Sequence, residues 1–236
     1  MSYFFEGVLK NSIPYQVRRL STNDMAQILA LQEIVVQTLD NKDILQPLSY
    51  EEFQFITDGN GILIGAFAEQ KLIAFRALLV PPVDEDGHLG LDIGLPKNEL
   101  QNVIYQEISN VHPDYRGNGL QQQLAQLIMQ ELSKEKQTYK YICATVMPFN
   151  IPSLKDKFSQ GMIIAVLKEK YEGRLRYVFY KRLGEDAPYE WAETTELAMS
   201  DIKGQQNLLE KGWRGFKMDK REGKLVVVYG KRISGR

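Results

Sequence analysis

Apolar residues recur along the chain with two different periods, which separate expected strands from expected helices. Residues 62–68 and 72–80 are nearly continuous apolar runs joined through Glu69–Lys71, which is typical of a buried β-hairpin. Residues 25–39 and 120–132 place apolar side chains every three or four positions, which is typical of amphipathic helices. Further strands are expected over residues 15–20, 101–112 and 139–148, a short helix over 150–161 and a long hairpin over 162–183.

The order of these elements up to Leu183 predicts a mixed α/β (α+β) domain with a central β-sheet flanked by helices. After Leu183 the pattern changes. Residues 184–191 have linker character, residues 194–212 are expected to be helical, and residues 213–233 are expected to form another hairpin. We therefore expect one domain over 1–183 and a C-terminal helix-plus-hairpin extension over 184–236. No internal repeat is apparent in the sequence.

Composition narrows the classes of function. The chain has 236 residues, a formal net charge of −1 and a sequence pI of about 6.2, which gives no electrostatic reason to expect nucleic acid or an anionic membrane as a partner. One cysteine and two histidines make a zinc site improbable. The N-terminus lacks the pattern of a signal peptide, and no apolar run approaches the length of a membrane span, so a cytoplasmic protein is expected.

The turn between the strand ending at Val111 and the helix beginning at Leu120 has the features of an anion site. A helix N-terminus leaves about four backbone N–H groups without partners, and glycines at 117 and 119 allow a bulky anion to approach them. Arg116 adds a fork of donors that suits phosphate. The turn is neither a P-loop nor a dinucleotide fingerprint, because Gly-x-x-x-x-Gly-Lys is absent and Gln122 stands where a third glycine would be needed. The alternative is an ordinary turn that uses Asn-Gly for its geometry.

The wider pattern around this turn resembles a known motif. The matching residues are Val111, Pro113, Tyr115, Arg116, Gly117 and Gly119, and they resemble the acetyl-coenzyme-A motif of the GNAT superfamily of N-acetyltransferases. A second segment, with Asn150, Ser153, Gly161 and Met162, is similar to the next motif of that superfamily at the expected distance. The resemblance covers residues 15–183 and leaves the C-terminal extension unexplained.

The resemblance implies a GNAT-like splayed sheet and acetyl-coenzyme A (acetyl-CoA) as the cofactor. It implies that Asn110 and Val111 pair through their backbones with the pantetheine arm, and that Asn150 and Ser153 flank the far side of the cofactor. The backbone N–H groups that would bind the pyrophosphate belong to Arg116, Gly117, Asn118, Gly119, Leu120 and Gln121. The acceptor would be a primary amine of a small molecule or a peptide, and the question of a homodimer stays open.

Acetyl transfer from a thioester to an amine needs a neutral amine, stabilisation of charge on the carbonyl oxygen, and a proton for the departing thiolate. The best candidate for the base is Glu107, on the strand that leads to the turn; the alternative is a solvated or salt-bridged strand glutamate. Cys143 lies in an apolar strand, and we interpret it as a core residue.

Two positions depart from the pattern of the family. Gln121 stands where the superfamily usually has a small residue. Lys157 stands where many members place a tyrosine that protonates the thiolate, so the usual acid is missing. Lys157 becomes the candidate acid; the alternative is a lysine solvated on the helix surface. The missing tyrosine favours an alternative function, a GNAT-fold sensor that binds acyl-CoA with little turnover.

An acidic segment comprising Asp84, Glu85, Asp86, His88 and Asp92 is a second place where a cationic amine could be attracted, although solvated loop charge is the simpler interpretation.

Overall fold

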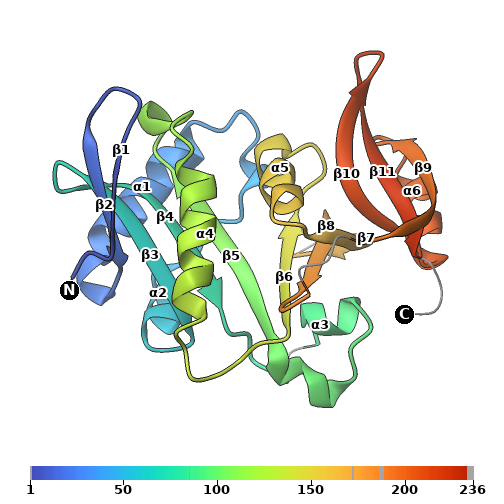
Figure 1. Ribbon diagram of the computed structural model, residues 1–236, viewed down its shortest axis with the longest axis horizontal. Coiled ribbons are helices and arrows are strands. Elements are labelled where there is room, and N and C mark those ends of the chain that lie inside the picture. Colours follow the sequence, from blue (N-terminus) through green and yellow to red (C-terminus); the bar gives the residue numbers. More distant parts are fainter. Residues whose placement is uncertain (1, 85, 172, 186–188, 233–236) are drawn as a thin grey trace. The chain divides into compact units, whose positions relative to one another are not determined.

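The computed structural model describes residues 2–84, 86–171, 173–185 and 189–232. The chain divides into two compact units, which the ribbon in Figure 1 shows coloured along the sequence. The first unit comprises residues 1–81 and 105–138, and the second comprises residues 82–104 and 139–236. None of the helices in the described part of the chain is long and apolar enough to cross a membrane.

The first unit contains consecutive antiparallel strand pairs in the order β1-β2-β3-β4-β5. Helix α4 covers one face of these strands, while α1 and α2 cover the other (Figure 1). The strands are β1 (Phe5–Val8), β2 (Pro14–Arg19), β3 (Gly61–Ala68), β4 (Lys71–Leu79) and β5 (Val103–Val111, which belongs to this unit from residue 105 on), and the helices are α1 (Met25–Gln37), α2 (Tyr50–Thr57) and α4 (Leu120–Leu132).

Local turn chemistry explains the central hairpin of this unit. Glu69 and Gln70 connect β3 to β4 and both have positive φ angles, 49° and 65°, as a two-residue turn of type I′ requires. The hairpin predicted over residues 62–80 is therefore confirmed. Its inner face packs against α1 and α2 in a core that includes Ile28, Phe53 and Phe75, all fully buried.

Helix α2 was not predicted, although its start is encoded locally. The Ser49 hydroxyl accepts a hydrogen bond from the Glu52 backbone N–H (3.2 Å), and the Glu52 carboxylate accepts one from the Ser49 N–H (2.7 Å). This reciprocal capping box satisfies two backbone donors that the first turn of a helix leaves without partners. The spacing Ser-x-x-Glu was readable in the sequence before the apolar pair Phe53 and Ile56.

The second unit contains antiparallel strand pairs in the order β6-β8-β7-β10-β11-β9. Its strands are β6 (Tyr141–Val146), β7 (Ile163–Lys170), β8 (Arg174–Arg182), β9 (Trp191–Ala198), β10 (Arg214–Arg221) and β11 (Lys224–Arg232), and its helices are α3 (Leu89–Asp92), α5 (Ile151–Ser159) and α6 (Ile202–Glu210). The hairpins predicted over 162–183 and 213–233 are confirmed within the described residues, which end at residue 232.

One prediction in this unit is wrong. The segment from residue 194 was expected to be helical, but residues 191–198 form strand β9, and α6 begins only at Ile202. Strand β9 pairs along its length with β11, from Ala198 opposite Val226 to Trp191 opposite Arg232. This long-range pairing overrides the weak helical preference of Glu, Leu, Ala and Met in that segment.

The acidic segment that precedes β5 is held by lysines. The Asp92 carboxylate pairs with Lys168 (2.7 Å) and Lys170 (2.5 Å) of β7, and Lys170 also donates to the Gly87 carbonyl (2.8 Å). His88 is buried, and burial lowers the pKa of its imidazole. The Asp92 carboxylate is thus occupied by two lysines, which favours the simpler interpretation of this segment as structural charge. Glu85, also part of that hypothesis, lies outside the described residues.

Candidate functional site: the turn before helix α4

The turn between β5 and α4 adopts the conformation that its glycines allow. Gly117 and Gly119 have φ angles of 80° and 75°, a region that disfavours residues with a Cβ atom. Gly119 is the N-cap of α4 and provides no side-chain cap. A Cβ atom added at either glycine would have no heavy atom within 4 Å, so an incoming group can reach this backbone closely.

The first turn of α4 offers a set of backbone donors. The first helical hydrogen bond runs from the Gln123 N–H to the Gly119 carbonyl (3.0 Å), so the N–H groups of Leu120, Gln121 and Gln122 precede it. These donors lie at the positive end of a helix of 13 residues. The geometry fits a diphosphate, because an anion supplies the acceptors that the helix itself does not.

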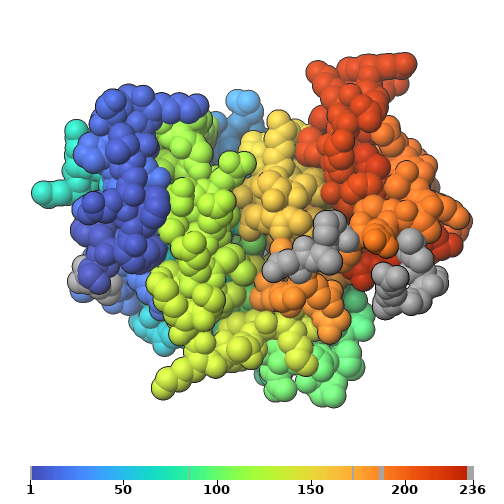
Figure 2. Space-filling view, viewed as in Figure 1, coloured from blue at the N-terminus to red at the C-terminus, as the bar shows by residue number. Residues whose placement is uncertain are grey.

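The turn is anchored to its own unit by two side chains. The Asn118 amide oxygen accepts from the Lys10 backbone N–H (2.9 Å), and its NH₂ group donates to the Tyr115 carbonyl (3.0 Å). Arg116 donates to the Thr38 hydroxyl at the end of α1 (3.1 Å). The space-filling view shows α4 and the β1–β2 hairpin side by side (Figure 2). The side chain of Asn118 is therefore committed to the fold, which leaves its backbone for a ligand.

A buried arginine that the sequence analysis did not single out lies beneath the start of α4. Arg76 of β4 is only 1% exposed; it donates to the Gln106 side chain (2.6 Å) and to the Gln121 carbonyl (3.4 Å). A cation at this place adds to the positive potential at the helix N-terminus. A charged residue within the apolar run of residues 72–80 was the signal that could have identified it.

Glu107 lies in a β-bulge. Strand β5 pairs with β4 through Ile108 opposite Ala77 and then through Gln106 opposite Leu78, so Glu107 is the extra residue. The bulge reverses the alternation of the strand: Ile108 belongs to the core beneath α1 and α2, whereas Gln106 reaches Arg76 on the α4 face. Bulges of this kind re-aim side chains and are common beside active sites.

Three residues after the bulge, Asn110 presents an unusual polar group. Its side chain is 2% exposed, and within the described part of the chain its NH₂ group has no hydrogen-bond partner. Asn110 pairs with Phe75, a member of the core beneath α1 and α2, so both side chains lie on that face. A buried donor without a partner is costly in free energy and is therefore a candidate for contact with a ligand.

The remaining predicted residues belong to the second unit. Asn150 is the N-cap of α5, and its side-chain oxygen accepts from the Ser153 backbone N–H (3.3 Å). Lys157 is 7% exposed in the last turn of the same helix and pairs with Asp156 (3.0 Å). The structure thus places Glu107, Asn110, Val111 and residues 116–121 in one unit, and Asn150, Ser153 and Lys157 in the other.

Two further features bear on the chemistry. Cys143 is fully buried in β6, and this burial raises the pKa of its thiol, in agreement with its interpretation as a core residue. Among the described residues, no group of three His, Cys, Asp or Glu side chains could hold a metal ion.

The fold is similar to that of solved acetyltransferases. An acetyltransferase of the GNAT family from Streptococcus pneumoniae has 18% identity and a TM-score of 0.53, covering 72% of this chain and 99% of its own. The GNAT domain of PAT from S. lividans has 17% identity and a TM-score of 0.52, covering 76% and 96%. The yncA protein of Salmonella typhimurium, solved with its cofactor acetyl-CoA, has 15% identity and a TM-score of 0.53, covering 74% and 97%.

No family model matches the chain, and no curated protein matches it significantly. The likeness is therefore one of structure at low sequence identity. The chain has the fold of the GNAT superfamily of acetyltransferases, a mixed β-sheet flanked by helices. The fold class and the resemblance predicted from the two sequence motifs are confirmed.

Proposed function

We propose that this protein is a GNAT-type N-acetyltransferase that moves an acetyl group from acetyl-CoA to a primary amine by direct transfer within a ternary complex. The observation that carries the proposal is the turn before α4. It combines two glycines with positive φ, a helix start without a side-chain cap, and the buried cation of Arg76. The GNAT fold, and the acetyl-CoA bound in the structure of one neighbour, support the same conclusion.

Each residue has a proposed role. The backbone N–H groups of residues 116–121 bind the diphosphate of coenzyme A, and the backbone of Asn110 and Val111 pairs with the pantetheine arm. Asn150 and Ser153 contribute the start of α5 as a second contact. Acetyl-CoA supplies an activated thioester, so positioning of the amine provides much of the rate and no enzyme nucleophile is required.

Glu107 is proposed as the general base that removes a proton from the amine, directly or through water, and Lys157 as the acid for the leaving thiolate. The bulge supports the first role because it sets Glu107 apart from the regular pairing of β5. The buried pair of Lys157 with Asp156 favours the second candidate function, a sensor that binds acyl-CoA with little turnover, because a lysine held in an ion pair replaces the usual tyrosine.

A panel of amines with acetyl-CoA, followed by the release of free thiol, distinguishes these functions. Release that depends on one class of amine supports the transferase. Tight binding of coenzyme A in calorimetry, with no thiol release for any acceptor, supports the sensor. A chain that neither binds coenzyme A nor releases thiol would contradict both.

The substitution Glu107→Gln tests the base. We expect kcat/KM to fall by about 10²- to 10⁴-fold, because a glutamine cannot accept the proton, while the affinity for coenzyme A stays unchanged. Glu6→Gln in the exposed strand β1 is the matched control and should leave turnover at its original level. Equal kinetics for the two variants would remove Glu107 from the mechanism.

Other expectations remain predictions: a cytoplasmic location, a small-molecule or peptide acceptor, and a domain boundary between residues 183 and 184.

A further inference from the structure

The second unit contains the same sequence of elements twice. Strand β6, helix α5 and the hairpin β7–β8 are followed by strand β9, helix α6 and the hairpin β10–β11. Helices α5 and α6 begin 51 residues apart, at Ile151 and Ile202, and strands β7 and β10 begin 51 residues apart, at Ile163 and Arg214. We call residues 141–182 the first βαββ copy and residues 191–232 the second βαββ copy. From the sequence alone we expected no internal repeat.

The two helices are built by equivalent hydrogen bonds. Asn150 caps α5 with φ −73° and ψ 75°, and Asp201 caps α6 with φ −83° and ψ 75°. Each side chain accepts from the backbone N–H three residues later. In both copies a glycine with positive φ, Gly161 or Gly212, lies two residues after the last residue of the helix, and the backbone hydrogen bonds that close the two ends have matching lengths of 3.0 and 3.1 Å.

Strand registers match as well. Strand β7 has a bulge at Ala165 against β8, and strand β10 has a bulge at the equivalent Phe216 against β11. In the first βαββ copy Val146 lies opposite Tyr177, and in the second the equivalent Leu197 lies opposite Val227. Caps, bulges and registers are independent features, so their joint agreement indicates a duplicated unit rather than a chance recurrence of βαββ.

The duplication is difficult to recognise in the sequence because most equivalent positions of the two copies carry different residues. Few equivalent positions are identical, and several of those are turn or strand-end residues. The identical pairs are Ile151/Ile202, Gly161/Gly212, Gly173/Gly223, Leu175/Leu225, Val178/Val228, Lys181/Lys231 and Arg182/Arg232. The shared signal is therefore mainly structural.

The copies meet through equivalent edges. Strands β7 and β10 pair antiparallel, and the residues directly opposite each other are Ile164 and Gly215, which occupy the same position in the two copies. Helix α6 packs against β7 and α5 against β10, so each copy contacts the other crosswise. Equivalent loops also touch, through the Phe149 N–H and the Met199 sulfur (3.3 Å). An approximate twofold axis thus passes between Ile164 and Gly215, as in an isologous dimer.

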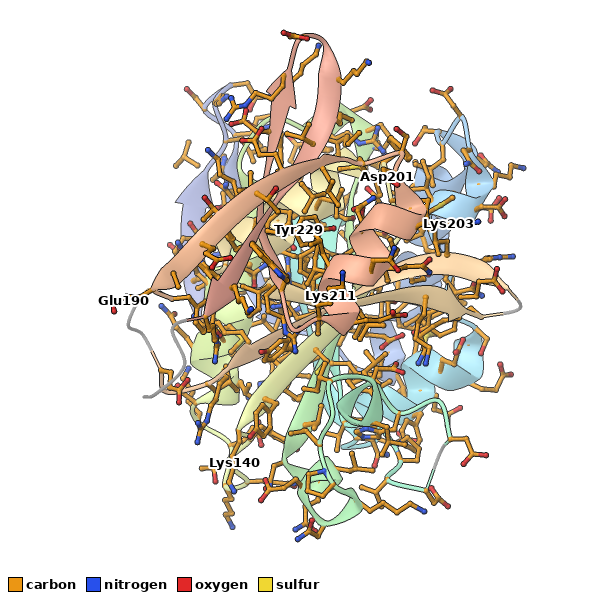
Figure 3. The ribbon with its side chains drawn as sticks, turned by 90° about the vertical axis from the view of Figure 1, so that its right-hand side faces the viewer. Lys140, Glu190, Asp201, Lys203, Lys211 and Tyr229 are labelled. Carbon is orange, nitrogen blue, oxygen red and sulfur yellow. The ribbon has the colours of Figure 1, made fainter. Side chains whose placement is uncertain are left out.

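One buried polar cluster breaks this symmetry and binds the copies together. Gln205 of α6 is fully buried, and its side-chain oxygen accepts from the hydroxyls of Tyr177 in β8 (2.6 Å) and Tyr229 in β11 (2.7 Å). Its NH₂ group donates to the Met199 carbonyl (2.9 Å). Figure 3 looks onto this part of the chain, with Asp201 and Lys211 at the two ends of α6 and Tyr229 nearby. The equivalent of Gln205 is the buried Leu154, so the cluster belongs to one side only.

We propose that the second βαββ copy is a duplicate of the first and acts as its partner within the chain. It occupies the edge of β7, an interaction surface that fits another copy of the same unit. An open edge strand is a template for pairing with other molecules, and the duplicate supplies that pairing internally. The residue pair at the axis reflects this role, because a glycine on one side makes room for the isoleucine on the other.

Exchange of the two axis residues in the full chain tests the proposal. A Cβ atom at Gly215 would lie 2.9 Å from the Ile164 Cδ1 atom, so Gly215→Ile should lower the urea midpoint of unfolding and cause concentration-dependent association in sedimentation velocity. Ile164→Gly should also lower the midpoint, because it leaves a void. The double exchange restores one large and one small residue across the axis, and it should recover most of the lost midpoint and return sedimentation to that of the natural chain.

A second exchange at equivalent positions away from the axis is the control. Leu154→Gln with Gln205→Leu also swaps the two copies, but it buries an amide without Tyr177 and Tyr229 hydroxyls to satisfy it. This double variant should be less stable than either single variant. The proposal is overturned if the axis exchange behaves in the same way, or if Gly215→Ile unfolds and sediments like the natural chain.

A disulfide provides a test that does not depend on tolerance of a large side chain. Directly opposed residues in an antiparallel pair have Cα atoms about 4.5–5.5 Å apart, within the range of a disulfide. Ile164→Cys with Gly215→Cys should therefore form an intramolecular crosslink, and the oxidised protein should keep the mass of one chain. Each single variant should remain uncrosslinked. A covalent dimer from the double variant, or no crosslink at all, would overturn the internal pairing of the copies.

Discussion

At the scale of a single residue, substitution of Asn110 can distinguish a role in ligand binding from a role in folding, because the described part of the fold makes no use of its buried amide donor. Its buried NH₂ group has no partner among the described residues, so the fold bears the cost of desolvating a donor. Its neighbour Ser109 has a buried hydroxyl that likewise lacks a partner in the described chain, but Ser109 lies opposite Arg76 on the other face of the sheet. The two adjacent residues form a matched pair for mutation.

Asn110→Leu should raise the free energy of unfolding by about 1 kcal/mol, because an unsatisfied polar group is replaced by an apolar one of similar size. If the amide contacts the acceptor or the acyl group, turnover should fall at least tenfold in the thiol-release assay. Ser109→Ala should change stability in the same direction and leave turnover within a factor of about two. A destabilised Asn110→Leu variant with full turnover would show that the amide serves the fold alone.

At the scale of an element, helix α1 is anchored at its start by an ion pair. The two terminal nitrogens of the Arg18 guanidinium, Nη1 and Nη2, donate to the Asp24 carboxylate at 2.8 and 2.6 Å, and Asp24 also accepts from the Ser21 N–H (2.9 Å). The bonds from Arg18, followed by those from Ser21, hold the pKa of Asp24 below 3.8 although burial opposes them. A depressed pKa means that this stabilisation is present above pH 3.8 and is lost as the pH falls through the lower value of the folded state.

Arg18→Met should therefore cost about 2 kcal/mol at pH 7, the scale of hydrogen bonds to a charged group. The difference from the natural chain should shrink as the pH falls below 3.8, where Asp24 of the unfolded chain becomes protonated, and it should vanish below the lower pKa of the folded state. Urea unfolding of the variant and the natural chain at pH 7 and at pH 3 measures the difference in free energy of unfolding at each pH. Lys42→Met, which removes an exposed cation, should have little effect at either pH. A pH-independent loss in Arg18→Met would indicate packing rather than charge.

Elements with local signals could be predicted, whereas elements that depend on distant pairing could not. The hairpin at Glu69–Gln70 and the helix after Gly119 follow from turn chemistry and periodicity within a few residues. Strand β9 depends on its register with β11, whose paired residues run from Val226 opposite Ala198 to Arg232 opposite Trp191 and so lie far along the chain, and no local pattern revealed it.

The residues of the candidate site also fall into two groups, those that a local sequence pattern identifies and those that depend on strand pairing. The turn of residues 116–121 is contiguous, so its glycines and the helix start identified it from sequence. The bulge at Glu107 and the contact of Arg76 with Gln121 depend on the pairing of β4 with β5, which becomes visible only in three dimensions. Gln121, which stands where the superfamily usually has a small residue, contributes through its backbone. Its carbonyl accepts a hydrogen bond from Arg76, and its N–H belongs to the first turn of α4.

At the scale of the whole molecule, the two βαββ copies differ in charge where their helices begin. The first has the neutral amide of Asn150, and the second has the carboxylate of Asp201. A carboxylate already interacts with the positive end of α6 and would repel an anionic cofactor. Titration calorimetry should therefore give one coenzyme A per chain despite the duplication. A stoichiometry of two would show that the second copy has kept a binding site.

The central claim is that the backbone at the start of α4 holds the diphosphate of coenzyme A. Gly119→Asp and Gly119→Asn test it as a pair, because both residues tolerate positive φ and differ by one charge. Aspartate should stabilise the helix start at least as well as asparagine, since it places a negative charge at the N-terminus. The decisive measurement is the Kd for coenzyme A by titration calorimetry. The account predicts binding at least tenfold weaker for Gly119→Asp than for Gly119→Asn, about 1.4 kcal/mol. Equal affinities for the two variants would place the diphosphate elsewhere and contradict the account.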